Sequence, residues 1–132
     1  VFINVPVLKN HGGATMTIAM KNLMGIIWDR RFWHDNDLHQ CIADFATWNR
    51  QPDLNIVDAY NAMMKNGPRG VSVNDVRNMK AMLLSKDMVT VDAAATKLWG
   101  RKPESVDYIP IADKMGIGEM DLENLRIKKI KI

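Results

Sequence analysis

The sequence gathers two lysines, a histidine and two adjacent glycines near its start. Lys9 and His11 follow an apolar stretch, Gly12 and Gly13 come next, and Lys21 lies further on in a helix-like pattern. A lysine supplies positive charge, and a histidine exchanges protons near neutral pH because its unperturbed pKa is about 6.5. Backbone N–H groups at the start of a helix also attract anions. The pattern predicts a site for an anionic ligand at which His11 transfers a proton.

The local structure expected here is a strand, a glycine turn and then a helix. Residues 1–9 are nearly all apolar, as in a strand covered on both faces, although Pro6 favours an edge or a bulge. After the glycines, apolar residues recur at helical spacing until about Gly25. Lys21 would then lie about 10 Å into the helix, within reach of the turn because helical side chains lean toward the N-terminus. The alternative interpretation is a capped helix with exposed lysines.

Two carboxylates lie in otherwise apolar surroundings. Asp58 is inside the strand-like stretch 53–60, just before the turn-rich residues 66–70, and Asp92 lies on the apolar face of a predicted helix. Burying a carboxylate without partners is costly, so each is expected to be hydrogen-bonded or functional. We assign Asp58 to the candidate site and expect a structural hydrogen bond for Asp92.

A second group of side chains could bind a metal ion. His34, Asp35, Asp37 and His39 offer imidazole and carboxylate groups within six positions, which are ligand types for zinc, nickel or iron. Their spacing fits no strict metal signature, and the alternative is a solvated loop. Cys41 is the one cysteine, which excludes an internal disulfide and a cluster held by several thiolates of this chain. Its helical spacing with apolar neighbours places it in the core.

Composition and patterning predict one α/β domain. With 132 residues, 47% of them hydrophobic, the chain suits a single domain over residues 1–132. A small mixed sheet with helices packed on it is expected from alternating strand and helix patterns. The expected strands are 1–9, 53–60, 79–85 and 125–131, and the expected helices, besides the one after the glycines, are 37–49, 88–99 and 107–115, with a loop between residues 28 and 37 and a short helical turn near Asn74.

Several function classes are disfavoured. The formal charge is +3, but the basic residues are scattered apart from residues 126–132, so we expect no nucleic-acid partner. No apolar run approaches the length of a membrane span and no leader opens the chain, so no signal or transmembrane segment is expected in these residues. Because the chain begins without methionine and inside an apolar element, we interpret it as part of a larger domain.

The sequence resembles the family catalogued as domain of unknown function 362, over essentially its whole length. The similarity lies in "NVPVLKNHGGATMTIAMKNLMGI", "LHQCIADF", "PDLNIVDAY", "NGPRG", "LLSKDMVTVDAAATKLWG" and "MGIGEMDL". It corresponds to the C-terminal part of that domain. The resemblance implies that the family's recurring elements fall here on Lys9, His11, Lys21, Asn22, Asp58, Gly67, Pro68, Ser85 and Asp87.

Relatives in this family often carry four-iron four-sulfur clusters. Cys41 alone cannot hold one, so the resemblance implies that any such cluster of the full-length protein lies outside this chain, which itself holds no cofactor. The resemblance also implies a redox-associated or enzymatic role in the full-length protein. The expected catalytic residues are His11, Lys21 and Asp58, and the expected ligand-binding residues are Lys9, Gly12, Gly13, Thr15, Asn22, Gly67, Pro68 and Arg69.

The alternative function is a non-catalytic binding or assembly module that packs against a missing N-terminal half. The apolar opening strand supports this alternative, since a strand of this kind needs cover on both faces. We therefore expect an exposed apolar patch, and either self-association or binding of the missing half.

Overall fold

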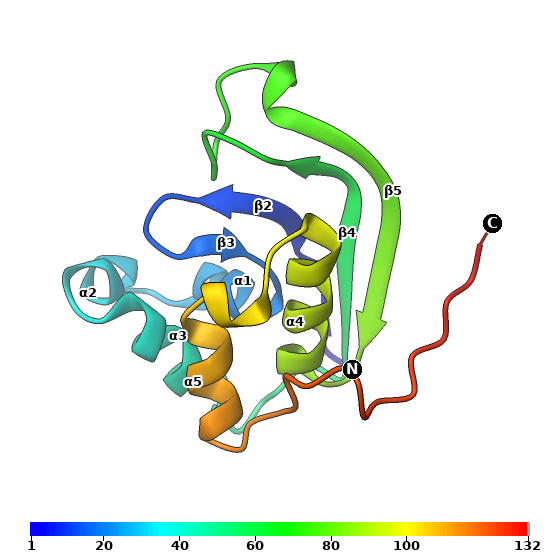
Figure 1. Ribbon diagram of the computed structural model, residues 1–132. Coiled ribbons are helices and arrows are strands. Elements are labelled where there is room, and N and C mark those ends of the chain that lie inside the picture. The colour runs from blue at the N-terminus through cyan, green and yellow to red at the C-terminus, as the bar shows by residue number, and fades with distance from the viewer. Residues whose placement is uncertain (132) are drawn as a thin grey trace.

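A five-stranded mixed sheet forms the centre of the computed structural model, which describes residues 1–131 (Figure 1). The strands are β1 (Ile3–Asn4), β2 (Val7–His11), β3 (Thr15–Thr17), β4 (Leu54–Met63) and β5 (Val76–Ser85). β4 pairs in parallel with β1 and β2 along one edge and antiparallel with β5 along the other. β3 pairs antiparallel with β2. Pro6 separates β1 from β2, as its missing N–H predicts.

The helices lie on one side of this sheet (Figure 1). They are α1 (Ala19–Asn22), α2 (Arg30–Asp35), α3 (Leu38–Phe45), α4 (Met88–Trp99) and α5 (Tyr108–Lys114), with 3-10 turns η1 (Leu23–Ile26), η2 (Val73–Asp75) and η3 (Pro103–Ser105). The core lies between the two layers, where Leu8 and Val57 of the sheet and Val89 of α4 are fully buried. Among residues 1–131, no helix has the length and apolar character needed to cross a membrane.

The opposite side of the sheet, here called the outer face, is apolar and exposed. Side chains alternate along the strands, so that Val57 points to the helices while its neighbours point away. Val5 is 59% exposed and Met82 is 64% exposed on this face. Ile3, Val7 and Leu84 are exposed there as well. The exposed apolar patch expected from the opening strand is therefore present.

Local capping residues fix where the longer helices begin. Asp37 caps α3 by accepting hydrogen bonds from two backbone N–H groups, and Asp87 caps α4 in the same way. Gly100 ends α4 with a φ of 94°, a left-handed conformation that glycine adopts without strain. The short helical turn expected near Asn74 is η2.

The region after the glycines differs from the prediction. Instead of one long helix, residues 15–17 form strand β3, which folds back on β2 as a hairpin, and only a single turn of α-helix follows before η1. The pairing with β2 outweighs the helical spacing of the apolar residues. Residues 30–35, expected in a loop, form α2, because Asp29 caps it by accepting from the Phe32 N–H.

The expected helix 37–49 ends at Phe45, and the expected strand 125–131 is absent. Residues 126–131 form no regular structure and pair with no strand, while Ile132 lies outside the described residues. Alternation of isoleucine and lysine therefore did not suffice to form a strand here, because a strand also requires a neighbour with which to pair.

Candidate functional site

His11 stands at the end of β2, where the chain turns through Gly12 and Gly13 into β3. Its Nδ1 atom accepts hydrogen bonds from the backbone N–H groups of Gly13, at 3.2 Å, and Ala14, at 3.0 Å. Since two donors point at Nδ1, that nitrogen carries no proton and the hydrogen of the neutral ring is on Nε2. The turn N–H groups expected to bind an anion are therefore used by the histidine.

The surroundings of His11 favour its neutral form. Burial lowers its pKa from 6.5 to about 4, and the charges of Lys21, His34, Lys9 and His39 act in the same direction. The ring of His34 stacks on it with a centroid distance of 6.0 Å. At pH 7 the His11 ring is neutral and offers Nε2–H as a donor, which corrects the expectation of an unperturbed proton carrier.

Lys21 is a buried lysine without an acidic partner. Its side chain belongs to α1 and the residue is only 7% exposed. Nζ lies 2.9 Å from the Met24 thioether sulfur, and no carboxylate lies within ion-pair distance of it among residues 1–131. Burial lowers the pKa of Lys21, and the positive charges of Lys9 and Arg30 lower it further.

Thr17 adds an unsatisfied hydroxyl beside these cations. It pairs with Lys9 across the β2–β3 hairpin and is 5% exposed. Its Oγ1 is buried and has no hydrogen-bond partner within the described part of the chain. We call Lys9, His11, Thr17 and Lys21 the cationic cluster. Thr17 was not among the expected site residues, because it lies in β3 and not on the helix face that carries Lys21.

The N-terminus of α1 is occupied by a side chain of the protein itself. The Asp92 carboxyl group accepts hydrogen bonds from Ala19 N–H, at 2.7 Å, and Met20 N–H, at 3.1 Å. Burial raises the pKa of Asp92 to about 8, although the two N–H donors oppose this shift. The structural hydrogen bond expected for Asp92 is confirmed. The expectation of free helix N–H groups next to the glycine turn is wrong.

Asp58 does not join the cationic cluster. Its neighbours Val57 and Ala59 are fully buried toward the helices, so the alternation of β4 places Asp58 on the outer face. There it lies opposite Val7 and Met82 in the register, and it accepts a hydrogen bond from the Tyr60 N–H. The charges that shift the pKa of His11 do not include Asp58.

The loop of residues 66–70 docks against the strand that carries Lys9 and His11. Gly67 N–H donates to Asn10 Oδ1 at 3.1 Å, and a Cβ at Gly67 would lie only 1.7 Å from the Asn10 carbonyl oxygen. Only glycine fits this close approach. Pro68 and Arg69 follow and are exposed to solvent.

Asn22 and Thr15, two further expected ligand-binding residues, take part in pairing within the fold itself. Asn22 donates to Asn4 Oδ1 at 2.8 Å, and Asn4 donates to both Asn55 Oδ1 and the Ala19 carbonyl, each at 3.0 Å. This amide network holds α1 against the sheet. Thr15 is half-buried with a φ of 63° and forms the first residue of β3.

The candidate metal ligands do not form a coordination sphere. His34 stacks on His11, whereas His39 stacks on Tyr108 and lies 3.7 Å from an Asp107 carboxylate oxygen. No three His, Cys, Asp or Glu side chains within residues 1–131 are arranged to hold one metal ion. Cys41 is a single, half-buried thiol whose pKa is raised by burial and by Asp44 and Asp37, so the residues present do not fit an iron-sulfur cluster.

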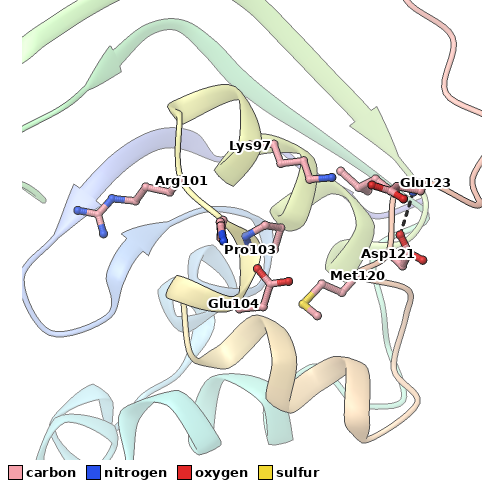
Figure 2. A pocket seen from close by; sticks show the side chains of 9 residues that line it. Lys97, Arg101, Pro103, Glu104, Met120, Asp121 and Glu123 are labelled. Carbon is pink, nitrogen blue, oxygen red and sulfur yellow. Dashed lines mark hydrogen bonds between the residues drawn. The ribbon is translucent and has the colours of Figure 1, made fainter.

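Two cavities of the structure lie away from the cationic cluster. One of about 380 Å³ lies beside the end of α4, and Figure 2 shows Glu104 and Met120 directed toward it, with Glu123 N–H donating to the Asp121 carboxylate at its edge. Another, of about 310 Å³, is lined by residues that include Gln51 and Lys86. Neither cavity includes a member of the cationic cluster.

Comparison with known proteins yields one family and one curated relative. The family model described as Domain of unknown function (DUF362) matches residues 1–97. A thylakoid-associated protein of Synechocystis sp. is 28% identical over 125 residues, which cover 89% of this chain and 38% of that protein. The chain thus spans well under half the length of this relative. No solved structure matches it.

Proposed function

The chain belongs to the family described as Domain of unknown function (DUF362), and from that premise we propose that it supplies a binding site for an anionic group of a ligand or cofactor. Lys21 is the observation that carries the proposal. The Lys21 residue is 7% exposed and the hydrogen-bond partner of its ammonium group is a thioether sulfur, so the group loses hydration without gaining a counter-charge. A bound anion would supply that counter-charge.

The other members of the cationic cluster suit the same ligand. Lys9 adds a second positive charge, and its cross-strand partner Thr17 has a hydroxyl that still lacks an acceptor within residues 1–131. His11 offers Nε2–H, because its Nδ1 is occupied by two backbone donors. Phosphate and carboxylate oxygens accept hydrogen bonds from all of these groups.

Anion binding would also prepare His11 for proton transfer. Positive neighbours and burial now hold its pKa near 4, and a negative charge placed between His11 and the lysines would raise that pKa toward neutrality. A ligand would thereby convert a neutral donor into a group able to accept and release a proton. In a longer protein this supports an enzymatic or redox-associated role, with any iron-sulfur cluster held by residues outside this chain.

A phosphate titration followed by amide NMR tests the proposal. The amides of residues 9–21 should shift first, and Lys21→Met should abolish those shifts because it removes the buried charge while keeping a similar volume. Lys114→Met is the matched control, since Lys114 is exposed on α5. Shifts confined to residues 126–131, or equal effects of the two substitutions, would show a general basic surface and contradict the proposal.

The outer face favours a second candidate function, an assembly module. β1 and β2 pair in parallel with β4, and parallel strands are nearly always covered on both faces. The chain matches only 38% of the curated relative, so a longer protein has further residues that could cover this face. Sedimentation velocity over a range of concentrations tests it: self-association that Met82→Gln weakens supports the module, and a strict monomer with no affinity for the remaining part of such a longer protein contradicts it.

A further inference from the structure

Lys21 differs from every other lysine of the chain in its surroundings. Within residues 1–131 it is the one buried lysine, since Lys9 is half-buried and the others are exposed. The two charged side chains that shift its pKa, Lys9 and Arg30, are both cations and both lower it. The Arg30 guanidinium is itself directed to the Gly25 carbonyl, at 2.9 Å, at the end of the same helical segment.

These surroundings lower the pKa of Lys21 and so make its free amine more accessible than that of an exposed lysine. An ammonium group is stabilised by water and by nearby carboxylates, and Lys21 has little of the first and, among the described residues, none of the second within ion-pair distance. Neighbouring cations repel the protonated form further. The Met24 sulfur at 2.9 Å is an uncharged, weak acceptor, so it stabilises the ammonium form far less than a carboxylate would.

We propose that the ε-amino group of Lys21 acts as a nucleophile that forms an imine with a small aldehyde or ketone bearing a carboxylate or phosphate. The inference rests on the proposed anion site, because Lys9 and Thr17 would hold the negative group while Lys21 reaches the carbonyl carbon. A desolvated lysine beside another cation is a known way to activate an amine for this chemistry.

The step is balanced without an oxidant or reductant. The nitrogen lone pair of Lys21 attacks the carbonyl carbon, the C=O π bond breaks, and the oxygen takes up one of the two amine protons to give a carbinolamine. The C–O bond then breaks, the oxygen leaves as water with the second N–H proton, and the nitrogen lone pair forms the C=N bond. The charge of Lys21 lowers the pKa of His11, which puts the two side chains in the same neighbourhood, and the neutral His11 ring offers Nε2–H as a hydrogen-bond donor to the departing oxygen.

Reductive trapping tests the inference. The folded chain is incubated at pH 7 with glyoxylate and cyanoborohydride, and the modified lysines are located by peptide mass mapping. We expect Lys21 to be labelled faster than exposed Lys114, since its lowered pKa leaves a larger fraction of free amine. Phosphate should slow the labelling of Lys21 only. Lys21→Arg, which keeps a cation but forms no imine, should leave Lys114 labelling unchanged.

The outcomes separate this inference from the proposed function. Even labelling of the exposed lysines, or no label on Lys21 while phosphate still shifts the amides of residues 9–21, would overturn the imine and leave the anion site intact. Labelling of Lys21 without any phosphate-induced shift would contradict the anion site. Equal rates with glyoxylate and uncharged propanal would overturn the requirement for an anionic substrate and with it the inference as stated.

Discussion

Asp92 and Lys21 are both ionisable side chains buried against α1, but they differ in what surrounds them. Asp92 reaches from α4 to the first turn of α1, where two backbone N–H groups donate to its two oxygens. Lys21 lies in the last turn of the same helix and meets only a sulfur atom. The difference teaches that burial of a charge is not by itself a sign of function. A buried group whose partners are present belongs to the scaffold, whereas one whose partners are missing is where we propose that a ligand binds.

The two regions are connected, because the first holds the second in place. Asp92 attaches α1 to α4, and the amides of Asn4 and Asn22 attach it to the sheet. A single helical turn has little stability of its own, so these side-chain bonds determine where Lys21 lies. Substitutions in the two regions should therefore have opposite consequences for stability and for binding.

The largest expected effect is that of Asp92→Ala. It leaves two buried N–H groups without acceptors and opens a cavity, so the free energy of unfolding should fall by about 3 kcal/mol. Urea denaturation measures this change. Asp35→Ala is the control, since Asp35 forms only an exposed pair with Arg31 and its loss should cost less than about 0.5 kcal/mol. Equal effects of the two variants would show that the Asp92 carboxyl group does not stabilise the fold.

The pH dependence of stability should separate the contribution of Asp92, in the scaffold, from that of His11, in the cationic cluster. Asp92 has its pKa raised from 3.8 to about 8, so the stability it contributes is complete at low pH and is lost as the pH rises toward 8. His11 has its pKa lowered from 6.5 to about 4, so its contribution is complete above pH 6.5 and is lost as the pH falls toward 4. The two contributions oppose each other below pH 6.5.

Between pH 6.5 and 8 only the Asp92 contribution changes, which makes this window the decisive one. We expect the free energy of unfolding to fall by about 2 kcal/mol across it, at about 1.4 kcal/mol per pH unit. Asp92→Asn should flatten the profile in this window, and His11→Gln should leave it unchanged there while altering it below pH 6.5. A slope that persists in Asp92→Asn would assign the titration to another group.

Lys21→Met should be tolerated where Asp92→Ala is not. Replacing a buried, unpartnered cation by an apolar side chain of similar volume removes a desolvation cost, so the free energy of unfolding should stay constant or rise by up to about 1 kcal/mol. Phosphate affinity should at the same time fall at least about tenfold, the equivalent of one charge-assisted hydrogen bond. A marked loss of stability would mean that Lys21 has a structural partner after all.

The parts of this arrangement that could be predicted from sequence are the local ones. Asp37, Asp87 and Gly100 are of residue types that commonly cap helices, and each lies at the end of a helix next to an apolar helical pattern. The concentration of Lys9, His11 and Lys21 was visible because their side-chain chemistry is unusual at any position. Such signals need no knowledge of distant contacts.

The remaining features depend on tertiary pairing. The hairpin between β2 and β3 replaces the expected helix start because Thr17 pairs with Lys9 across the two strands. Residue spacing along the chain does not predict this pairing. Asp58 was assigned to the site from its position at a strand end, but the alternation of β4 turns it to the outer face. Thr17 went unnoticed as a site residue because a threonine becomes informative only once its hydroxyl is seen to lack a partner.

The smallest expected effect comes from a pair of threonines that repeats the comparison. Thr17 Oγ1 is buried without a partner in the described part of the chain, whereas Thr96 Oγ1 donates to the Asp92 carbonyl oxygen at 2.8 Å. Valine has nearly the shape of threonine but lacks the hydroxyl.

Thr17→Val should raise the free energy of unfolding by up to about 0.5 kcal/mol, and Thr96→Val should lower it by about 1 kcal/mol, since an existing hydrogen bond is lost only in Thr96→Val. Thr17→Val should also weaken phosphate binding several-fold, roughly the equivalent of one neutral hydrogen bond, while Thr96→Val leaves it unchanged. Urea denaturation and phosphate titration of the two variants measure both effects. If Thr17→Val destabilised the fold and left phosphate binding intact, its hydroxyl would belong with Asp92 to the scaffold and not with Lys21 to the binding site.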